Sequence, residues 1–175
     1  YTVVVSNPFD SVTSAVATVT VADMTAPTIV CPTNIIVECA GPPGTIVTYS
    51  ANAFDVCDTN VALVCAPPSG ATFGLGLTTV RCVATDDSGN TNSCSFTVRV
   101  QDTTPPTISC PASIIAAEFP HDGGTAVVTF APPVTGDLCD SSLAVACVPP
   151  SGAAFPVGYT TVLCTARDDS GNFNI

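Results

Sequence analysis

Cysteine is the residue type best suited to chemistry in this sequence, because its ten copies recur at a fixed spacing. Three of them return 82 residues further along the chain, so that Cys57, Cys65 and Cys82 are matched by Cys139, Cys147 and Cys164. Repeated cysteines in small modules favour disulfides and an oxidising compartment. Zinc binding is disfavoured, since the closest pairs enclose seven residues instead of roughly two to four, and His121 is the single histidine.

Acidic side chains form the second candidate group, and they gather in two turns of each copy. The first copy carries Asp55, Asp58, Asp86, Asp87 and Asn90, and the second carries Asp137, Asp140, Asp168, Asp169 and Asn172. Oxygen ligands in such numbers are what a hard cation such as calcium requires. The alternative is ordinary turn chemistry, because Asp, Asn, Ser and Gly favour tight turns without an ion. Arg81 and Arg167 are also available to pair with these acids.

The charge balance argues against nucleic-acid binding. The net charge is −11, with three arginines and no lysine, whereas binding to a phosphate backbone needs clustered basic residues. The chain is 46% apolar, enough to bury a core, and no apolar run approaches the roughly 18 residues of a membrane span. It starts without an initiator Met or a signal peptide. We therefore expect a segment of a longer chain, or a mature polymer subunit.

A strand, an acidic turn and a second strand organise the repeat. Thr78–Val100 has this pattern and returns as Thr160–Ile175, where the sequence stops as the second strand begins. Cys31 returns as Cys110 after only 79 residues, so about three residues are inserted near His121–Gly124. A period of roughly 80 residues fits a small independent domain. We predict three parts: residues 1–23, the last strands of a preceding domain or a donor strand segment; residues 24–102, domain 1; and residues 103–175, domain 2, lacking its last strand.

Short β-strands separated by turns are predicted throughout the chain. In Cys94–Val100 alternate side chains share one face, which is the pattern of a half-buried strand. The other expected strands include Pro27–Cys31, Ile35–Cys39, Thr45–Tyr49, Val61–Cys65, Thr78–Ala84, Thr107–Cys110, Ile114–Ala117, Ala126–Phe130, Leu143–Cys147 and Thr160–Ala166. No window has helical periodicity. Short strands with frequent turns predict an all-β fold of tandem β-sandwich domains.

A set of motifs then resembles a known family over Asp23–Ile175. These motifs are C-P, D-x-C, C-x-P-x-S-G, F-x-x-G, T-T-V-x-C-x-A-x-D-x-S-G-N and C-x-F-T-V-x-V, and together they look like the HYR (hyalin repeat) domain. The resemblance implies immunoglobulin-like sandwiches in extracellular proteins, often in tandem arrays linked to adhesion, and no catalytic activity. Tyr1–Val21 resembles the last two strands of a bacterial immunoglobulin-like domain.

Disulfide pairing within such a sandwich is a hypothesis, because six cysteines allow many connectivities. The first and last strands of a sandwich begin side by side, and adjacent antiparallel strands place other cysteines opposite each other. The expected pairs are Cys31–Cys94, Cys65–Cys82, Cys147–Cys164 and Cys39–Cys57.

Two cysteines of the second copy have no expected partner. Cys139 lacks one because Ala117, Glu118 and Phe119 stand where Cys39 stands in the first copy, so we expect either a buried free thiol or a bond to another chain. Cys110 would need a cysteine immediately beyond Ile175.

The sandwich order also places the acidic turns of each copy at the end where the chain enters. Asp23 precedes the first copy and Asp102 precedes the second, so both should lie near these turns. A bound calcium ion there would stiffen the joint between domains.

Three functions are compatible with these features. The first is a non-catalytic structural and adhesive module of an extracellular or cell-surface fibre, with neighbouring domains or copies of itself as partners. The second is a filament subunit that polymerises head-to-tail by strand donation, since an open sheet edge accepts a strand. The third is a carbohydrate-binding accessory module of a secreted enzyme, which would need a row of aromatics from Tyr1, Tyr49 and Tyr159. No catalytic motif is present, and His121 reads as an exposed loop residue.

Overall fold

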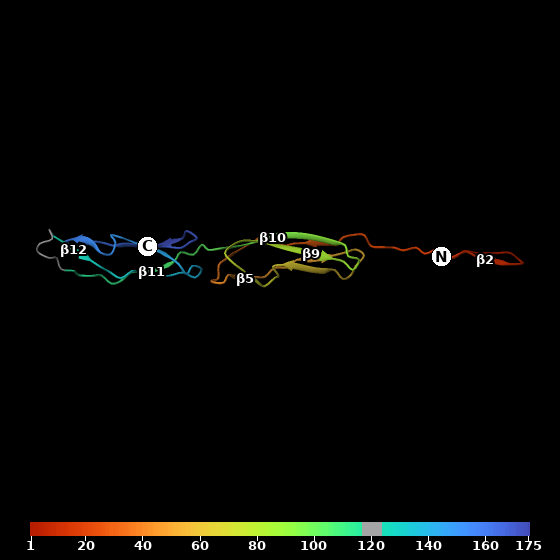
Figure 1. The fold of residues 1–175 in the computed structure, drawn as a ribbon, viewed down its shortest axis with the longest axis horizontal. Helices are drawn as coiled ribbons and strands as arrows, with labels where there is room; N and C mark the ends of the chain where they lie inside the picture. The colour runs from red at the N-terminus through yellow and green to blue at the C-terminus, as the bar shows by residue number, and fades with distance from the viewer. Residues whose placement is uncertain (117–123) are drawn as a thin grey trace. The chain divides into compact units, whose positions relative to one another are not determined.

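The computed structural model describes residues 1–116 and 124–175, which form strands, turns and loops and no helix. The predicted all-β class is therefore confirmed (Figure 1). The strands up to residue 101 are β1 (Val4–Ser6), β2 (Ser11–Thr13), β3 (Thr28–Val30), β4 (Ile35–Glu38), β5 (Thr45–Val47), β6 (Asn52–Phe54), β7 (Ala62–Ala66), β8 (Ala71–Phe73), β9 (Gly76–Thr85) and β10 (Thr91–Gln101). Those that follow are β11 (Thr107–Ser109), β12 (Thr125–Val128), β13 (Val134–Gly136), β14 (Ala144–Val148), β15 (Ala153–Pro156), β16 (Leu163–Arg167) and β17 (Phe173–Asn174).

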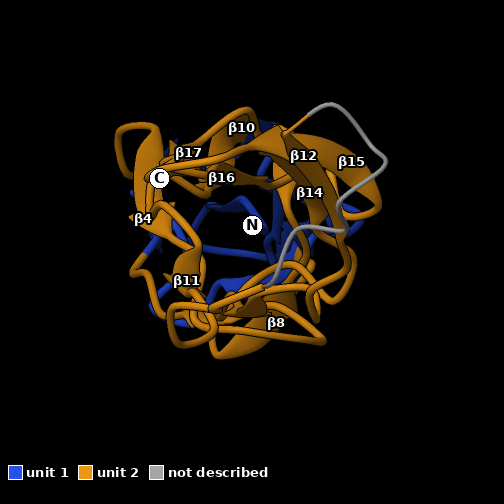
Figure 2. Ribbon diagram, turned by 90° about the vertical axis from the view of Figure 1, so that its left-hand side faces the viewer, with its two compact units in different colours: residues 1–31, 51–65, 82–94 blue, residues 32–50, 66–81, 95–175 orange. Residues whose placement is uncertain are grey.

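The contacts divide the chain into two compact units (Figure 2). Unit 1 comprises residues 1–31, 51–65 and 82–94, and unit 2 comprises residues 32–50, 66–81 and 95–175. This division cuts across the first sequence repeat, because β7, β9 and β10 each contribute residues to both units. These three strands and β4 form a four-stranded sheet in the order β4-β10-β9-β7.

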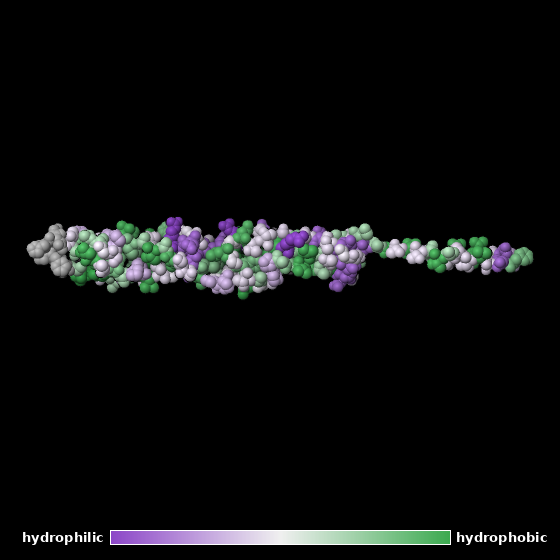
Figure 3. Space-filling view, viewed as in Figure 1, coloured by the Kyte–Doolittle hydropathy of each residue, from purple (hydrophilic) through white to green (hydrophobic). Residues whose placement is uncertain are grey.

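Unit 1 begins with an exposed hairpin. Strands β1 and β2 pair antiparallel with Val4 opposite Thr13, and every residue from Tyr1 to Ala22 is exposed. Apolar side chains are visible on the surface of this hairpin (Figure 3). After it, β3 pairs antiparallel with β6, and Pro27 just before β3 is fully buried. The hairpin therefore buries none of its own apolar residues, whereas the segment after it joins a core.

Unit 2 contains most of the buried apolar side chains of the described residues. Strand β4 runs parallel to β10, and β5 pairs antiparallel with β8. Along β10 the side chains of Phe96, Val98 and Val100 are buried, which agrees with the alternation read from the sequence. The ring of Tyr49 meets Phe96 edge-on, with centroids 4.9 Å apart. Burial of these apolar side chains, together with Val47 from β5, is the main source of stability here.

The second repeat, also in unit 2, is made of smaller sheets. Its strand pairs are β11–β13, β12–β15 and the three-stranded β14-β16-β17, all antiparallel. Cys164 and Ala166 of β16 are buried, while β17 has only two residues, both exposed. A groove of about 850 Å³ lies against β12, β15 and the segment Cys110–Ala116.

Some strand predictions differ from the structure. Strands β6, β8, β13 and β15 were not expected, because runs of three or four residues are too short to show a period of two. Ile114–Ala116 was expected to be a strand and is irregular. The described residues do not include the rest of that predicted strand, Glu118 or Phe119. They also leave out most of the insertion, with His121. Within the described ranges there is no helix long and apolar enough to cross a membrane.

Candidate functional site

The turn that follows β6 is held by Asp55. Its Oδ1 accepts hydrogen bonds from the backbone N–H of Cys57, at 2.8 Å, and of Asp58, at 3.3 Å. This is an Asx turn, the local structure that Asp forms readily when its side chain binds the backbone two residues on. The turn directs the Asp58 carboxylate toward the β9–β10 hairpin, where its Oδ2 accepts the N–H of Asp87 at 3.1 Å.

The β9–β10 hairpin turn is built on Asp86, which is buried. Its Oδ1 accepts the backbone N–H of Asn90 at 2.7 Å, and its Oδ2 accepts the side-chain amide of Asn90 at 2.8 Å. The same amide also donates to the backbone oxygen of Asp23 at 3.3 Å. The segment that leads into the first repeat is thus attached to the hairpin turn.

The second repeat reproduces the first of these turns. Asp137 Oδ1 accepts the N–H of Cys139 at 2.7 Å and of Asp140 at 3.0 Å. Asp140 Oδ2 in turn accepts the N–H of Asp169 at 3.0 Å. The local sequence therefore dictates the same backbone geometry in both copies.

The turn between β16 and β17 in the second repeat has the same hydrogen bonds as the β9–β10 turn in the first. Asp168 accepts the backbone N–H of Asn172 at 2.7 Å and its side-chain amide at 2.8 Å. That amide donates to the backbone oxygen of Asp102 at 3.1 Å. Asp102, in the linker, therefore stands to the second repeat as Asp23 stands to the first.

These bonds bring carboxylates together into four overlapping groups. In each group one candidate ligand atom from every residue lies within 4.8 Å of the others. The groups are Asp23, Asp55 and Cys57; Asp23, Asp58 and Asp86; Asp102, Asp137 and Cys139; and Asp102, Asp140 and Asp168.

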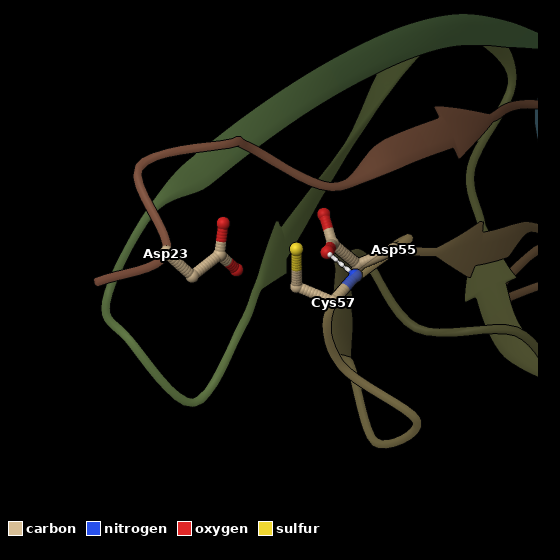
Figure 4. Close-up of side chains that lie close together, drawn as sticks. All are labelled: Asp23, Asp55 and Cys57. Atoms are coloured by element: carbon tan, nitrogen blue, oxygen red, sulfur yellow. Dashed lines mark hydrogen bonds between the residues drawn. The ribbon is translucent and has the colours of Figure 1, made fainter. Parts of the chain in front are cut away.

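The surroundings of Asp102 and of the Cys57 thiol disfavour the charged forms of these two groups. Burial raises the pKa of Asp102, and the nearby charges of Asp137 and Asp168 raise it further, whereas the backbone N–H of Thr104 and the side chain of Ser170 oppose this rise. The thiol of Cys57 lies between the carboxylates of Asp23 and Asp55 (Figure 4). The negative charge of Asp23 is the largest cause that raises the pKa of Cys57.

Not every predicted acidic residue belongs to a cluster. Asp87 and Asp169 are exposed and contribute backbone N–H groups, not carboxylates. Asn90 lies within the site but donates its amide to Asp86 and Asp23. Asp23 is a full member of the first clusters, although the sequence placed it only near them. The sequence signal for this role is the position of Asp23 just before the first repeat, which matches the position of Asp102 before the second.

Four disulfides are present in the described part of the chain. They are Cys31–Cys94, Cys39–Cys139, Cys65–Cys82 and Cys147–Cys164. Cys57 and Cys110 are exposed free thiols.

The expected Cys39–Cys57 bond is therefore corrected, as is the expectation that Cys139 lacks a partner in this chain. Cys39 bonds to Cys139, with Cα atoms 6.2 Å apart. The cause lies at the end of β4, where the N–H of Cys39 donates to the backbone oxygen of Gln101 at 2.8 Å. From Gln101 the chain runs directly into the linker and the second repeat, so Cys39 stands beside the next domain. The pairs expected from the sequence each lie within one repeat, whereas this bond joins the two repeats.

Disulfide-linked β domains with repeated acidic hairpin turns define a class of immunoglobulin-like modules. The HYR domain model matches residues 22–100 and 101–174, and the chain belongs to this family as two tandem HYR domains. The family resemblance read from the motifs is thereby confirmed. HYR modules are a non-catalytic family.

Three relatives illustrate the similarity. The chain is 34% identical to hyalin of Strongylocentrotus purpuratus over 160 residues, which is 89% of this chain and 13% of that protein. It is 35% identical to hyalin of Lytechinus variegatus over 105 residues, 59% of this chain and 20% of that protein. It is 33% identical over 105 residues to the sushi, von Willebrand factor type A, EGF and pentraxin domain-containing protein 1 of Rattus norvegicus, 57% of this chain and 3% of that protein.

The chain thus spans a fifth or less of the length of these relatives. Homology to hyalin together with four disulfides indicates an extracellular protein.

Proposed function

We propose that this chain is a structural and adhesive part of an extracellular or cell-surface fibre, in which neighbouring repeats are joined covalently as well as by the linker. The observation that carries this proposal is the disulfide between Cys39 of the first repeat and Cys139 of the second. A purely adhesive surface does not require its two domains to be cross-linked. A fibre under tension benefits, because the bond limits how far the joint extends.

Other contacts at the joint support the same role. The Glu38 carboxylate accepts the backbone N–H of Thr103 in the linker. Pro106, where the linker meets β11, is fully buried. Gly41 has a positive φ of 106°, and a Cβ there would lie 3.3 Å from the backbone oxygen of Leu138. The backbones on both sides of the joint therefore approach closely, and Gly is the residue that permits this.

The test is to stretch the oxidised chain by its two ends in a single-molecule force experiment. We expect resolved unfolding events and an extension limited by the disulfides. Extension to the full contour length without a resisting event would overturn the structural role. Attachment of cells or matrix to surfaces coated with the chain would test the adhesive role separately.

A second candidate, a filament formed by strand donation, is favoured by the groove in the second repeat. Its lining includes Phe130, Phe155 and Tyr159. In the first repeat, Phe96 and Val98 of β10 are buried, whereas in the second repeat β17 has only two residues and both are exposed. A strand from another copy, such as one from the exposed β1–β2 hairpin, is a suitable occupant.

The two candidates differ in solution. Strand donation predicts oligomers of the 175-residue chain that resist SDS, and a chain without residues 1–21 that stays monomeric. A monomer at all concentrations would rule out this second candidate. The carbohydrate-binding alternative is less favoured, because Tyr49 packs on Phe96 and donates its hydroxyl to the Pro67 oxygen. It is therefore not placed to join an exposed aromatic row.

A further inference from the structure

The carboxylate of Asp102 is buried without full pairing. Its exposed fraction is 8%. Oδ1 accepts the N–H of Thr104 at 3.1 Å, whereas Oδ2 is buried and has no hydrogen-bond partner. An ionised oxygen without a hydrogen bond is unfavourable, since it has lost water. The Ser170 side chain compensates the carboxylate in part, but burial remains the largest influence on it. Such a group in a folded protein calls for a partner that compensates the charge.

Two further oxygens share this condition. Within residues 1–116 and 124–175, the buried side-chain nitrogen and oxygen atoms that lack a partner are Oδ2 of Asp23, of Asp102 and of Asp137. All three belong to the carboxylate clusters of the two repeats. Ordinary packing defects would be scattered through the fold, whereas these three oxygens lie together in the clusters.

Turn chemistry explains only some of the oxygens. The Asx turn of the second repeat uses Oδ1 of Asp137, and the contact between its two turns uses Oδ2 of Asp140. These bonds leave Oδ2 of Asp137 and of Asp102 without a role. A tight turn needs no carboxylate from the linker, yet Asp102 is held beside Asp140 and Asp168.

We propose that a calcium ion binds in the second repeat to Asp102, Asp140 and Asp168, with Asp137 beside it, and that a second ion binds to the matching residues of the first repeat. The matching residues are Asp23, Asp58, Asp86 and Asp55. Calcium fits because it takes roughly six to eight oxygen ligands at flexible geometry. A softer metal does not fit the second repeat, since the sulfur of Cys139 is committed to a disulfide.

The consequence is mechanical coupling at the start of each repeat. Each ion would bridge the segment that leads into a repeat, through Asp23 or Asp102, to two turns that are 28 residues apart, such as those of Asp140 and Asp168. The amide contacts of Asn90 and Asn172 already hold that segment through its backbone. This inference goes beyond the proposed function, because it holds whether or not the chain belongs to a fibre.

The experiment is calorimetric titration of calcium chloride into the full oxidised chain in metal-free buffer, together with thermal unfolding. We expect about two ions per chain and a higher melting temperature with calcium. Asp102→Asn should remove one ion and most of the calcium-dependent melting shift of the second repeat. Asp10→Asn, which removes the same charge from the exposed β1–β2 hairpin, is the matched control and should bind two ions.

Absence of heat and of a melting shift at millimolar calcium would overturn the proposal. So would binding that Asp102→Asn leaves intact, because that result indicates diffuse attraction to an acidic surface. A measurement on the unmodified chain guards against a variant that fails to fold: manganese added at low ratio should broaden the amide NMR signals of Cys139 and Asp169 before those of the β1–β2 hairpin. Uniform broadening would also count against the site.

Discussion

Cys39 and Cys139 are joined by a disulfide although they are separated by 100 residues and belong to different HYR domains. The bond adds a second covalent connection beside the linker between Gln101 and Pro106. Two connections between the same domains remove many of the arrangements that a single linker permits.

Pulling on the chain ends should reveal this second connection directly. With all bonds intact, tension passes from Cys31 to Cys39 and crosses to Cys139. In Cys39→Ser the tension crosses the Cys31–Cys94 disulfide instead. The stretched path then contains the 45 residues from Cys94 to Cys139 in place of the 8 residues from Cys31 to Cys39. We expect the final contour length to grow by about 37 residues, on the order of 130 Å. Cys57→Ser is the control and should leave the length unchanged; an equal length in both variants would show that the bond is absent.

Peptide mapping without reduction provides an independent measurement of the pairing. Digestion after blocking free thiols should yield a peptide that joins Cys39 to Cys139, with Cys57 and Cys110 carrying the blocking group. Recovery of Cys39 linked to Cys57 would instead support the pairing inferred from the sequence and contradict the structure.

The reactivity of Cys57 should depend on Asp23. The carboxylate of Asp23 raises the pKa of the Cys57 thiol, chiefly through its charge. Only the thiolate reacts with alkylating agents, so a raised pKa slows alkylation at mildly alkaline pH. Asp23→Asn should lower that pKa and speed the reaction, measured in EDTA by mass spectrometry. Asp10→Asn is the control, and its Cys57 should be alkylated at the same rate as in the native chain. An unchanged alkylation rate in Asp23→Asn would disprove the electrostatic contact.

Acid should stabilise the wild-type chain relative to Asp102→Asn when calcium is removed. Burial raises the pKa of Asp102 in the folded state above its ordinary value of 3.8, so the folded state binds the proton more tightly than the unfolded state does. Ionised Asp102 therefore destabilises the fold above its folded pKa, and this cost disappears as the pH falls through that pKa. At neutral pH we expect the asparagine variant to be more stable by on the order of 1 kcal/mol.

The measurement is urea unfolding in EDTA across the acidic to neutral range. The stability difference between the two chains should shrink as the pH falls. A difference that stays constant with pH would mean that Asp102 does not titrate in a buried environment.

Much of the fold was predictable because it depends on local pattern. The alternation in Cys94–Val100 predicted which side chains of β10 are buried, and the repeated turns predicted where Asp86 and Asp168 gather with other acids. Turn chemistry and a period of two act over a few residues, so one sequence is enough to recognise them.

The features that escaped prediction depend on contacts between distant segments. The bond from Cys39 to Cys139 arises because the end of β4 lies beside Gln101, and β4 pairs in parallel with β10. The spacing of the cysteines in the sequence does not show that the end of β4 lies beside Gln101. The missing partner of Asp102 Oδ2 is likewise a property of burial, which depends on the packed structure.

Gly44 offers a test of the core of the first repeat that is independent of its disulfides. Its φ is +145°, and a Cβ there would lie 2.2 Å from the backbone oxygen of Phe73, at the pairing of β5 with β8. Because both atoms in this clash are close to the backbone, the strands must separate to relieve it. Gly44→Ala should therefore cost about 3 kcal/mol of unfolding free energy. Gly70 also has a positive φ, of +84°, but a Cβ there meets nothing within 4 Å, so Gly70→Ala should cost only about 1 kcal/mol, from backbone conformation alone. Urea unfolding of both variants measures the difference, and equal losses would show that β5 and β8 are not packed as closely as the structure has them.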